Sequence, residues 1–166
     1  MTIIKSLVDQ RPVALYSDDA TATGTIPVDL SSNTPKMVRR VVVPVQAGDL
    51  LKIDGYSRVT NDCGYTIGVG YHLWYFDVDD GQPWPHGTWK QIGNSNGDNV
   101  DPTRHHMPAH ISAAFIVPAD WPTGHRMTVV FQVDAHSTAW KSGDTLTVDS
   151  YGHLTVEKWS TAAPTA

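Results

Sequence analysis

Cysteine, charged residues and long apolar runs are all scarce in this sequence of 166 residues. The single cysteine, Cys63, excludes an internal disulfide and a metal site built from several thiolates, and we expect it to be a small turn residue rather than a reactive thiol. Charged residues make up only 17% of the chain, and no segment has the apolar periodicity of a helix longer than about two turns. These absences argue against both a disulfide framework and a helical fold.

The distribution of charge and apolar residues also limits the partners. The formal net charge of −5 comes with no basic run, and the two adjacent cations Arg39 and Arg40 should point to opposite faces of a strand. We therefore expect no nucleic-acid partner. No stretch approaches the ~20 apolar residues that span a bilayer, and the opening MTIIKSLVDQRP lacks the apolar core of a signal peptide. The expectation is a protein made in the cytoplasm, with no membrane partner.

Two segments, 41–61 and 115–137, show a related strand–turn–strand pattern. Each runs from β-branched residues through a Val-Pro pair into a turn with a glycine, Gly48 or Gly124, and then into a second strand. In that second strand the apolar residues alternate, which predicts one buried face. The alternating residues are Leu51, Ile53 and Val59 after the first turn, and Met127, Val129, Phe131 and Val133 after the second.

Turn residues and alternation together predict an all-β protein, a jelly-roll-like antiparallel β-sandwich of about eight strands with an irregular N-terminal arm. We expect an extended arm over 1–36 with one or two short strands, a sandwich domain over 37–160 and a polar tail over 161–166. The runs 93–99 and 151–152 are expected to be turns. The last strand should pair with an early one. The expected strands are 37–45, 49–60, 65–77, 87–92, 109–117, 125–135, 144–148 and 151–159.

Aromatic and acidic residues are concentrated in 74–89. Sugar rings stack on aromatic faces and their hydroxyls need polar partners, so this loop is a candidate glycan-binding site. Alternatively, Trp74 and Phe76 face the core while Trp84 caps the sandwich edge or meets a neighbouring subunit. The 77–81 segment fails the EF-hand pattern, although a looser calcium site stays open. The candidate glycan-binding residues are Trp74, Asp77, Asp79, Asp80, Trp84 and Trp89.

Three histidines, His105, His106 and His110, lie within six residues and could serve a metal-dependent, cupin-like enzyme if their rings converged inside a barrel. Adjacent residues of an extended segment point apart, however, and such clusters also pack at oligomer interfaces. We therefore expect no metal and no cofactor. The sequence also lacks GxSxG, the P-loop and GxGxxG, so we expect no enzyme, although separate Ser, His and Asp residues can still converge in a fold.

Val-Pro pairs, short acidic turns and a glycine-rich strand recur in this chain, at Val43-Pro44, Ala47-Gly48-Asp49, 65–72 (YTIGVGYH) and 117–122 (VPADWP). In these segments the chain resembles small β-sandwich virion proteins of tailed phages that infect actinobacteria, namely head-decoration, head-fibre and minor tail proteins. The resemblance covers about 37–160 and transfers no catalytic or binding residue.

The resemblance implies a non-enzymatic structural protein of the virion, most simply a capsid decoration protein that packs on the particle as a homotrimer. Its partners would be other copies of itself and the major capsid or tail proteins. One alternative is a minor tail protein or a receptor-binding module that recognises cell-surface glycan. The cupin-like enzyme is the second alternative.

Overall fold

The computed structural model describes residues 14–18, 24–28, 36–82 and 88–160, and within them the chain forms strands and no helix. None of the described residues therefore forms a helix that is long and apolar enough to cross a membrane. The strands are β1 (Ala14–Asp18), β2 (Gly24–Pro27), β3 (Lys36–Pro44), β4 (Leu50–Thr60), β5 (Ile67–Asp77), β6 (Lys90–Val100), β7 (Met107–Ile116), β8 (Arg126–His136) and β9 (Thr145–Trp159).

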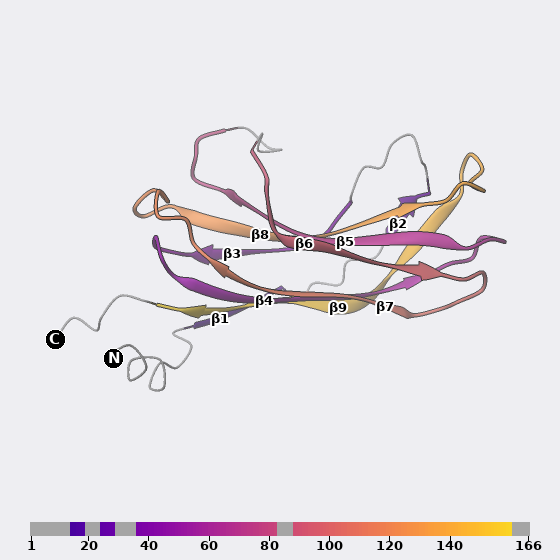
Figure 1. The fold of residues 1–166 in the computed structure, drawn as a ribbon, viewed down its shortest axis with the longest axis horizontal. Coiled ribbons are helices and arrows are strands. Elements are labelled where there is room, and N and C mark those ends of the chain that lie inside the picture. Colours follow the sequence, from indigo (N-terminus) through magenta and orange to yellow (C-terminus); the bar gives the residue numbers. More distant parts are fainter. Residues whose placement is uncertain (1–13, 19–23, 29–35, 83–87, 161–166) are drawn as a thin grey trace.

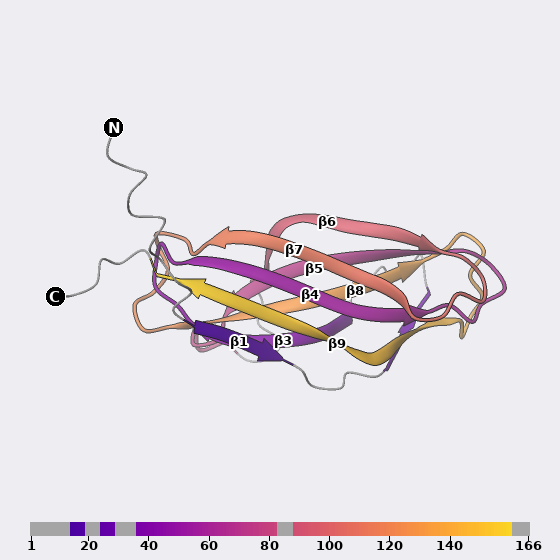
Figure 2. The ribbon, with the colours of Figure 1, turned by 90° about the horizontal axis from the view of Figure 1, so that it is seen from below.

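The strands form two antiparallel sheets that pack face to face, with β8 and β5 in one layer and β4 and β9 in the other (Figure 1). One sheet has four strands in the order β3-β8-β5-β6. The other has the order β1-β9-β4-β7, seen side by side in Figure 2, with β2 also paired to β9. The prediction of an all-β sandwich is confirmed.

Both strands from the predicted arm pair with the last strand, as expected for an early strand. β1 lies along 154–158 and β2 along 145–148, so the two share one position in the sheet. Counted this way the sandwich has about eight strand positions, and consecutive positions are distributed between the two sheets as in a jelly roll.

The alternating residues of β4 and β8 form the centre of the core, as predicted. Leu51, Ile53 and Val59 are buried, and Phe131 is fully buried between the sheets. A methyl group on Gly55 would come within 3.2 Å of the Phe131 ring, so the glycine makes room for the largest side chain at the centre. Burying one such aromatic side chain stabilises the fold by about 1.5–3 kcal/mol.

Two predicted turns are wrong, because both are irregular strands. The pair Tyr151-Gly152 lies within β9, where 149–151 form a bulge opposite Arg58 of β4. A methyl group on Gly152 would come 2.4 Å from the Tyr56 carbonyl oxygen, so this glycine permits close strand approach rather than a reversal. Likewise 93–99 belongs to β6, which is polar because it is an edge strand exposed along most of its length.

Candidate functional site

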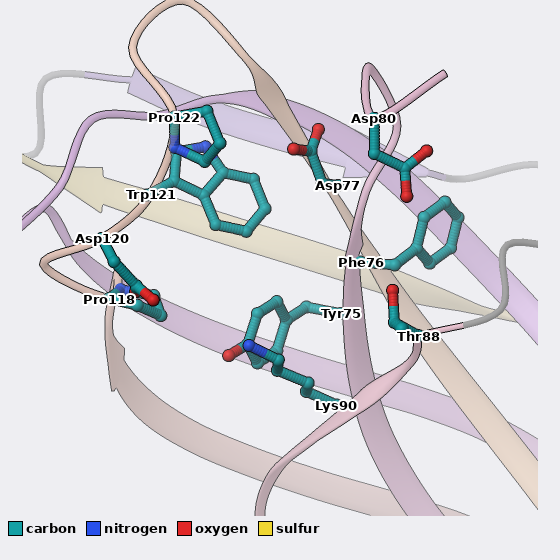
Figure 3. Close-up of a pocket in the computed structure, with 10 residues that line it drawn as sticks. All are labelled: Tyr75, Phe76, Asp77, Asp80, Thr88, Lys90, Pro118, Asp120, Trp121 and Pro122. Carbon is teal, nitrogen blue, oxygen red and sulfur yellow. The ribbon is translucent and has the colours of Figure 1, made fainter. Parts of the chain in front are cut away.

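A cavity of about 220 Å³ lies where the end of β5 meets the loop between β7 and β8. Tyr75, Phe76 and Asp77 line it from β5, and Trp121 lines it from the loop. In Figure 3 the Trp121 indole and the Tyr75 ring flank the space, with the Asp77 carboxylate beside the indole and Asp80 above the Phe76 ring. Aromatic and carboxylate groups thus meet in one concavity.

The loop that carries Trp121 is held by its own hydrogen bonds. The Trp121 backbone N–H donates to the Pro118 carbonyl at 3.1 Å, and the indole Nε1–H donates to the His125 carbonyl at 3.1 Å. The loop is also anchored to the turn before β4, because the Val117 N–H donates to the Asp49 carbonyl at 2.9 Å. The indole is therefore oriented before any ligand arrives.

The rings of Tyr75 and Trp121 form the apolar wall, and Phe115 packs against Tyr75 without lining the cavity. The Tyr75 ring lies 6.2 Å from the Trp121 ring and 4.7 Å from the Phe115 ring, centroid to centroid. Burial and, to a smaller extent, the nearby charge of Asp120 raise the pKa of Tyr75 above its ordinary value. The phenol is thus neutral and acts as a hydrogen-bonding group rather than a charge.

Polar side chains also line the cavity. Asp77 accepts a hydrogen bond at 2.7 Å from His125 Nδ1 and another at 2.9 Å from the Asp79 N–H. Asp80 accepts from the Gln82 N–H at 2.9 Å. Asp120 and Lys90 also line the cavity and add one charge of each sign. A ligand with several hydroxyls would find both donors and acceptors here.

Asp79 is turned away toward Arg126 and does not line the cavity. The guanidinium donates to the two carboxylate oxygens at 2.6 and 3.0 Å, and the Arg126 N–H donates at 2.8 Å. These hydrogen bonds hold the Asp79 pKa well below its usual range. The carboxylates of the 77–81 turn are therefore engaged within the chain, and the described residues include no group of three His, Cys, Asp or Glu ligands placed for a metal.

Neither Trp74 nor Trp89 of the predicted glycan loop lines this cavity. Tyr75 belongs to the core, so the neighbouring Trp74 points to the other face of β5, and the interpretation that Trp74 faces the core is wrong by one residue of register. Phe76 is buried, at 2% exposed, although it lies outside the main core cluster. Trp89 stacks on Phe76 with 5.2 Å between centroids. Trp84 lies outside the described residues. Of the predicted set, Asp77 and Asp80 line the cavity.

Each of the three histidines predicted as candidate metal ligands lies next to a different aspartate. His105 Nε2 lies 3.5 Å from Asp62, His106 Nδ1 lies 2.6 Å from Asp149, and His110 Nε2 lies 2.8 Å from Asp54. All three side chains are more than half exposed. The inward convergence that the cupin-like alternative requires is therefore not present among these residues.

Sequence reasoning missed Tyr75, Trp121 and Lys90 as lining residues. Trp121 was visible as part of a two-residue insertion, Trp121-Pro122, in the turn of the second strand–turn–strand segment. Nothing in the sequence places it beside β5, which precedes it by more than forty residues and meets it only through the sandwich.

The sequence matches no protein-family model and no curated protein. The fold is similar to solved structures from infectious bursal disease virus. A chain of the T13 viral particle aligns over 89% of this chain at a TM-score of 0.54 and 10% identity. The VP2 subviral particle aligns over 86% at 0.51 and 11%, and the Gx strain over 86% at 0.51 and 13%. This chain spans about a third of the length of those viral chains, and the likeness concerns the fold.

Proposed function

We propose that this protein is a structural component of a virus particle and packs on the particle surface as an oligomer, a homotrimer in its simplest form. The observation that carries the proposal is the jelly-roll strand order, in a fold similar to that of chains from viral and subviral particles. Its partners in this role are the major capsid or tail proteins. A capsid decoration protein is the simplest form of this role, and a minor tail protein is the alternative.

An apolar region on the outer face of the five-stranded sheet supports packing against another chain. Leu15 on β1 is 65% exposed and Ile116 on β7 is 66% exposed, so both edge strands present an aliphatic side chain. In register, Ile116 and Trp159 flank Leu50 on β4 and form an apolar patch there, whereas Leu15 pairs with Glu157. Exposed apolar groups gathered at one end of a sheet are typical of protein–protein contacts.

Light scattering at micromolar concentration tests the oligomer. We expect a trimer for the wild type and a smaller species for Ile116→Lys, because the charge would enter the apolar contact. Val42→Lys is the matched control, since Val42 is exposed on the other sheet and should leave the mass unchanged. A monomeric wild type, or equal masses for all three proteins, contradicts this arrangement.

A second candidate function, recognition of a sugar, is favoured by the cavity between Tyr75 and Trp121. Its volume of about 220 Å³ is below the roughly 300–1,000 Å³ of drug-sized ligand sites, which fits one sugar ring or the end of a chain. The aromatic wall suits a pyranose face, and the carboxylates that line the cavity suit its hydroxyls. A decoration or tail protein that binds cell-surface glycan would combine both roles.

A glycan array tests the sugar candidate. Trp121→Ala should remove binding that the wild type shows, because the indole forms one wall of the cavity. Trp140→Ala, an exposed tryptophan in the loop after β8, should bind as the wild type does. No binding by the wild type, or equal binding by Trp121→Ala, would eliminate the candidate.

A further inference from the structure

A serine, a histidine and an aspartate from three neighbouring strands form a continuous hydrogen-bonded chain on the outer face of the four-stranded sheet. Ser95 Oγ on β6 lies 2.7 Å from His72 Nδ1 on β5. His72 Nε2 in turn lies 2.5 Å from Asp134 Oδ2 on β8. This group is separate from the Tyr75–Trp121 cavity, and none of its members was singled out from the sequence.

The hydrogen bonds fix where the protons are. A carboxylate only accepts, so His72 Nε2 carries a hydrogen and donates it to Asp134. In the neutral ring Nδ1 is then the acceptor, and the Ser95 hydroxyl donates to it. Gln91 Nε2 donates to Ser95 Oγ at 2.8 Å, which leaves the hydroxyl proton directed at the imidazole. This is the tautomer in which a histidine acts as a general base toward a serine.

Burial holds the carboxylate and the imidazole in place. Asp134 is 7% exposed, and the hydrogen bond from His72 is the main reason that its pKa lies below the ordinary value, so it is ionised. A second imidazole, His136, lies 3.6 Å from its other oxygen. The side chain of His72 is 15% exposed, whereas Ser95 is on the open surface. The Ser95 end of this hydrogen-bonded series therefore faces solvent.

A bulge in β6 places Ser95 within hydrogen-bonding distance of His72. Leu73 pairs with Ile92 and Tyr71 with Asn96, so three residues, 93–95, lie opposite His72 alone. Gly93 begins the bulge with a φ of 64°, a conformation that favours glycine. Bulges of this kind re-aim side chains and are common next to active sites. The Asn- and Gly-rich run 93–99, which the sequence predicts to be a turn, thus contains the bulge that positions Ser95.

We propose that Ser95 is the nucleophile of an esterase site for small acyl esters, with His72 as general base and Asp134 as the residue that positions it. Ser95 also lines a polar cavity of about 350 Å³ between β6 and β7, which suits an acetyl-sized group on a polar alcohol. The exposed edge strand lets an ester borne on a polymer reach the hydroxyl. This goes beyond the structural role and runs against the expectation that the chain is not an enzyme.

The reaction would proceed in two steps. Ser95 Oγ bonds to the acyl carbon while its proton passes to His72 Nδ1, and the ester C–O bond breaks as the alcohol leaves with that proton. Water then attacks the acyl-serine, gives a proton to His72, and releases the carboxylic acid as Ser95 recovers its hydrogen. Gln91 Nε2 donates one hydrogen to Ser95 Oγ, and the second hydrogen of the same amide would be the donor to the developing oxyanion.

Hydrolysis of p-nitrophenyl acetate by the full chain tests the proposal. Exposed histidines react slowly with this ester, so rates are compared between variants. Ser95→Ala should lower the rate about 100-fold or more, the range of general-base and nucleophilic contributions. Ser142→Ala, an exposed serine in the loop before β9, should retain the wild-type rate. A fluorophosphonate probe should label the wild type at Ser95.

The variant Asp134→Asn tests whether Asp134 positions His72 for the reaction or only stabilises the fold. It should lower kcat with little change in KM and slow the labelling of Ser95 by the fluorophosphonate probe, because the imidazole loses the carboxylate that orients it. Circular dichroism verifies that each variant is folded. Label at another residue, a wild-type rate in folded Ser95→Ala, or a lower melting temperature of Ser95→Ala with no change in rate would each overturn the proposal.

Discussion

Gly70 on β5 and Asp134 on β8 face each other across the four-stranded sheet, and a methyl group on Gly70 would lie 2.6 Å from Asp134 Oδ2. The absence of a side chain at 70 is therefore what lets a buried carboxylate lie flat on the sheet and reach His72. Residue 70 must therefore be glycine for the Asp134 carboxylate to keep this position.

Gly70→Ala should destabilise the protein by about 1–3 kcal/mol, the usual cost of overpacking a filled site. Urea unfolding measures the effect. Gly64→Ala is the control, because a methyl group there would meet no atom within 4 Å. Equal stability of the two variants would mean that Asp134 does not occupy the space beside Gly70.

Phe131→Ala should cost about 3–5 kcal/mol, because it removes the ring at the centre of the core and leaves a cavity against Gly55. Ile116→Ala, at an exposed aliphatic residue, should stay within about 0.5 kcal/mol in the monomer. Thermal unfolding at low protein concentration compares them. If Phe131→Ala were as stable as Ile116→Ala, the two sheets could not pack as described.

Acid should weaken the fold through the aspartates that histidines surround. The pKa of Asp134 is lowered chiefly by the His72 hydrogen bond. For Asp54 the largest effect is burial, which raises the pKa, but the hydrogen bonds from His153 and His110 outweigh it and the net shift is downward. Each carboxylate therefore stabilises the folded state fully above the ordinary value of 3.8, and this contribution is lost as pH falls through the lowered folded-state pKa.

Urea midpoints measured from neutral pH to below 3.8 should fall less steeply in Asp134→Asn than in the wild type, because the variant lacks that proton uptake. Asp62→Asn alters a carboxylate that is 65% exposed and should follow the wild-type curve. An acid transition of Asp134→Asn identical to that of the wild type would contradict the linkage.

The sheet architecture could be predicted because alternation at Leu51, Ile53 and Phe131 follows directly from burial of one face of a strand. The wrong turn predictions arise at glycines, because glycine suits a turn and a bulged strand equally well. Gly152 and Gly93 indicate turns by composition, yet both lie in bulged strands, and only the neighbouring strand decides between the two. The expectation that Trp74 faces the core fails for a related reason, since aromatic residues fill either face of β5.

The candidate sites could be predicted only in part. Asp77 and Asp80 lie in an aromatic and acidic stretch that is visible in the sequence, but Trp121 joins them through the fold. The Ser95, His72 and Asp134 group spans 62 residues and has no motif, because its geometry comes from strand register and a bulge. The resemblance to phage virion proteins rests on short sequence features, namely Val-Pro pairs, acidic turns and a glycine-rich strand, and it stays a hypothesis.

Cryo-electron microscopy of purified virions whose genome encodes this chain is the decisive test of the virion role. We expect density for the two-sheet sandwich on the particle surface, repeated around a symmetry axis, with the Leu15 and Ile116 end of the five-stranded sheet in contact with another chain. If virions lack the protein by both density and mass spectrometry while infected cells contain it, the protein is not a component of the particle.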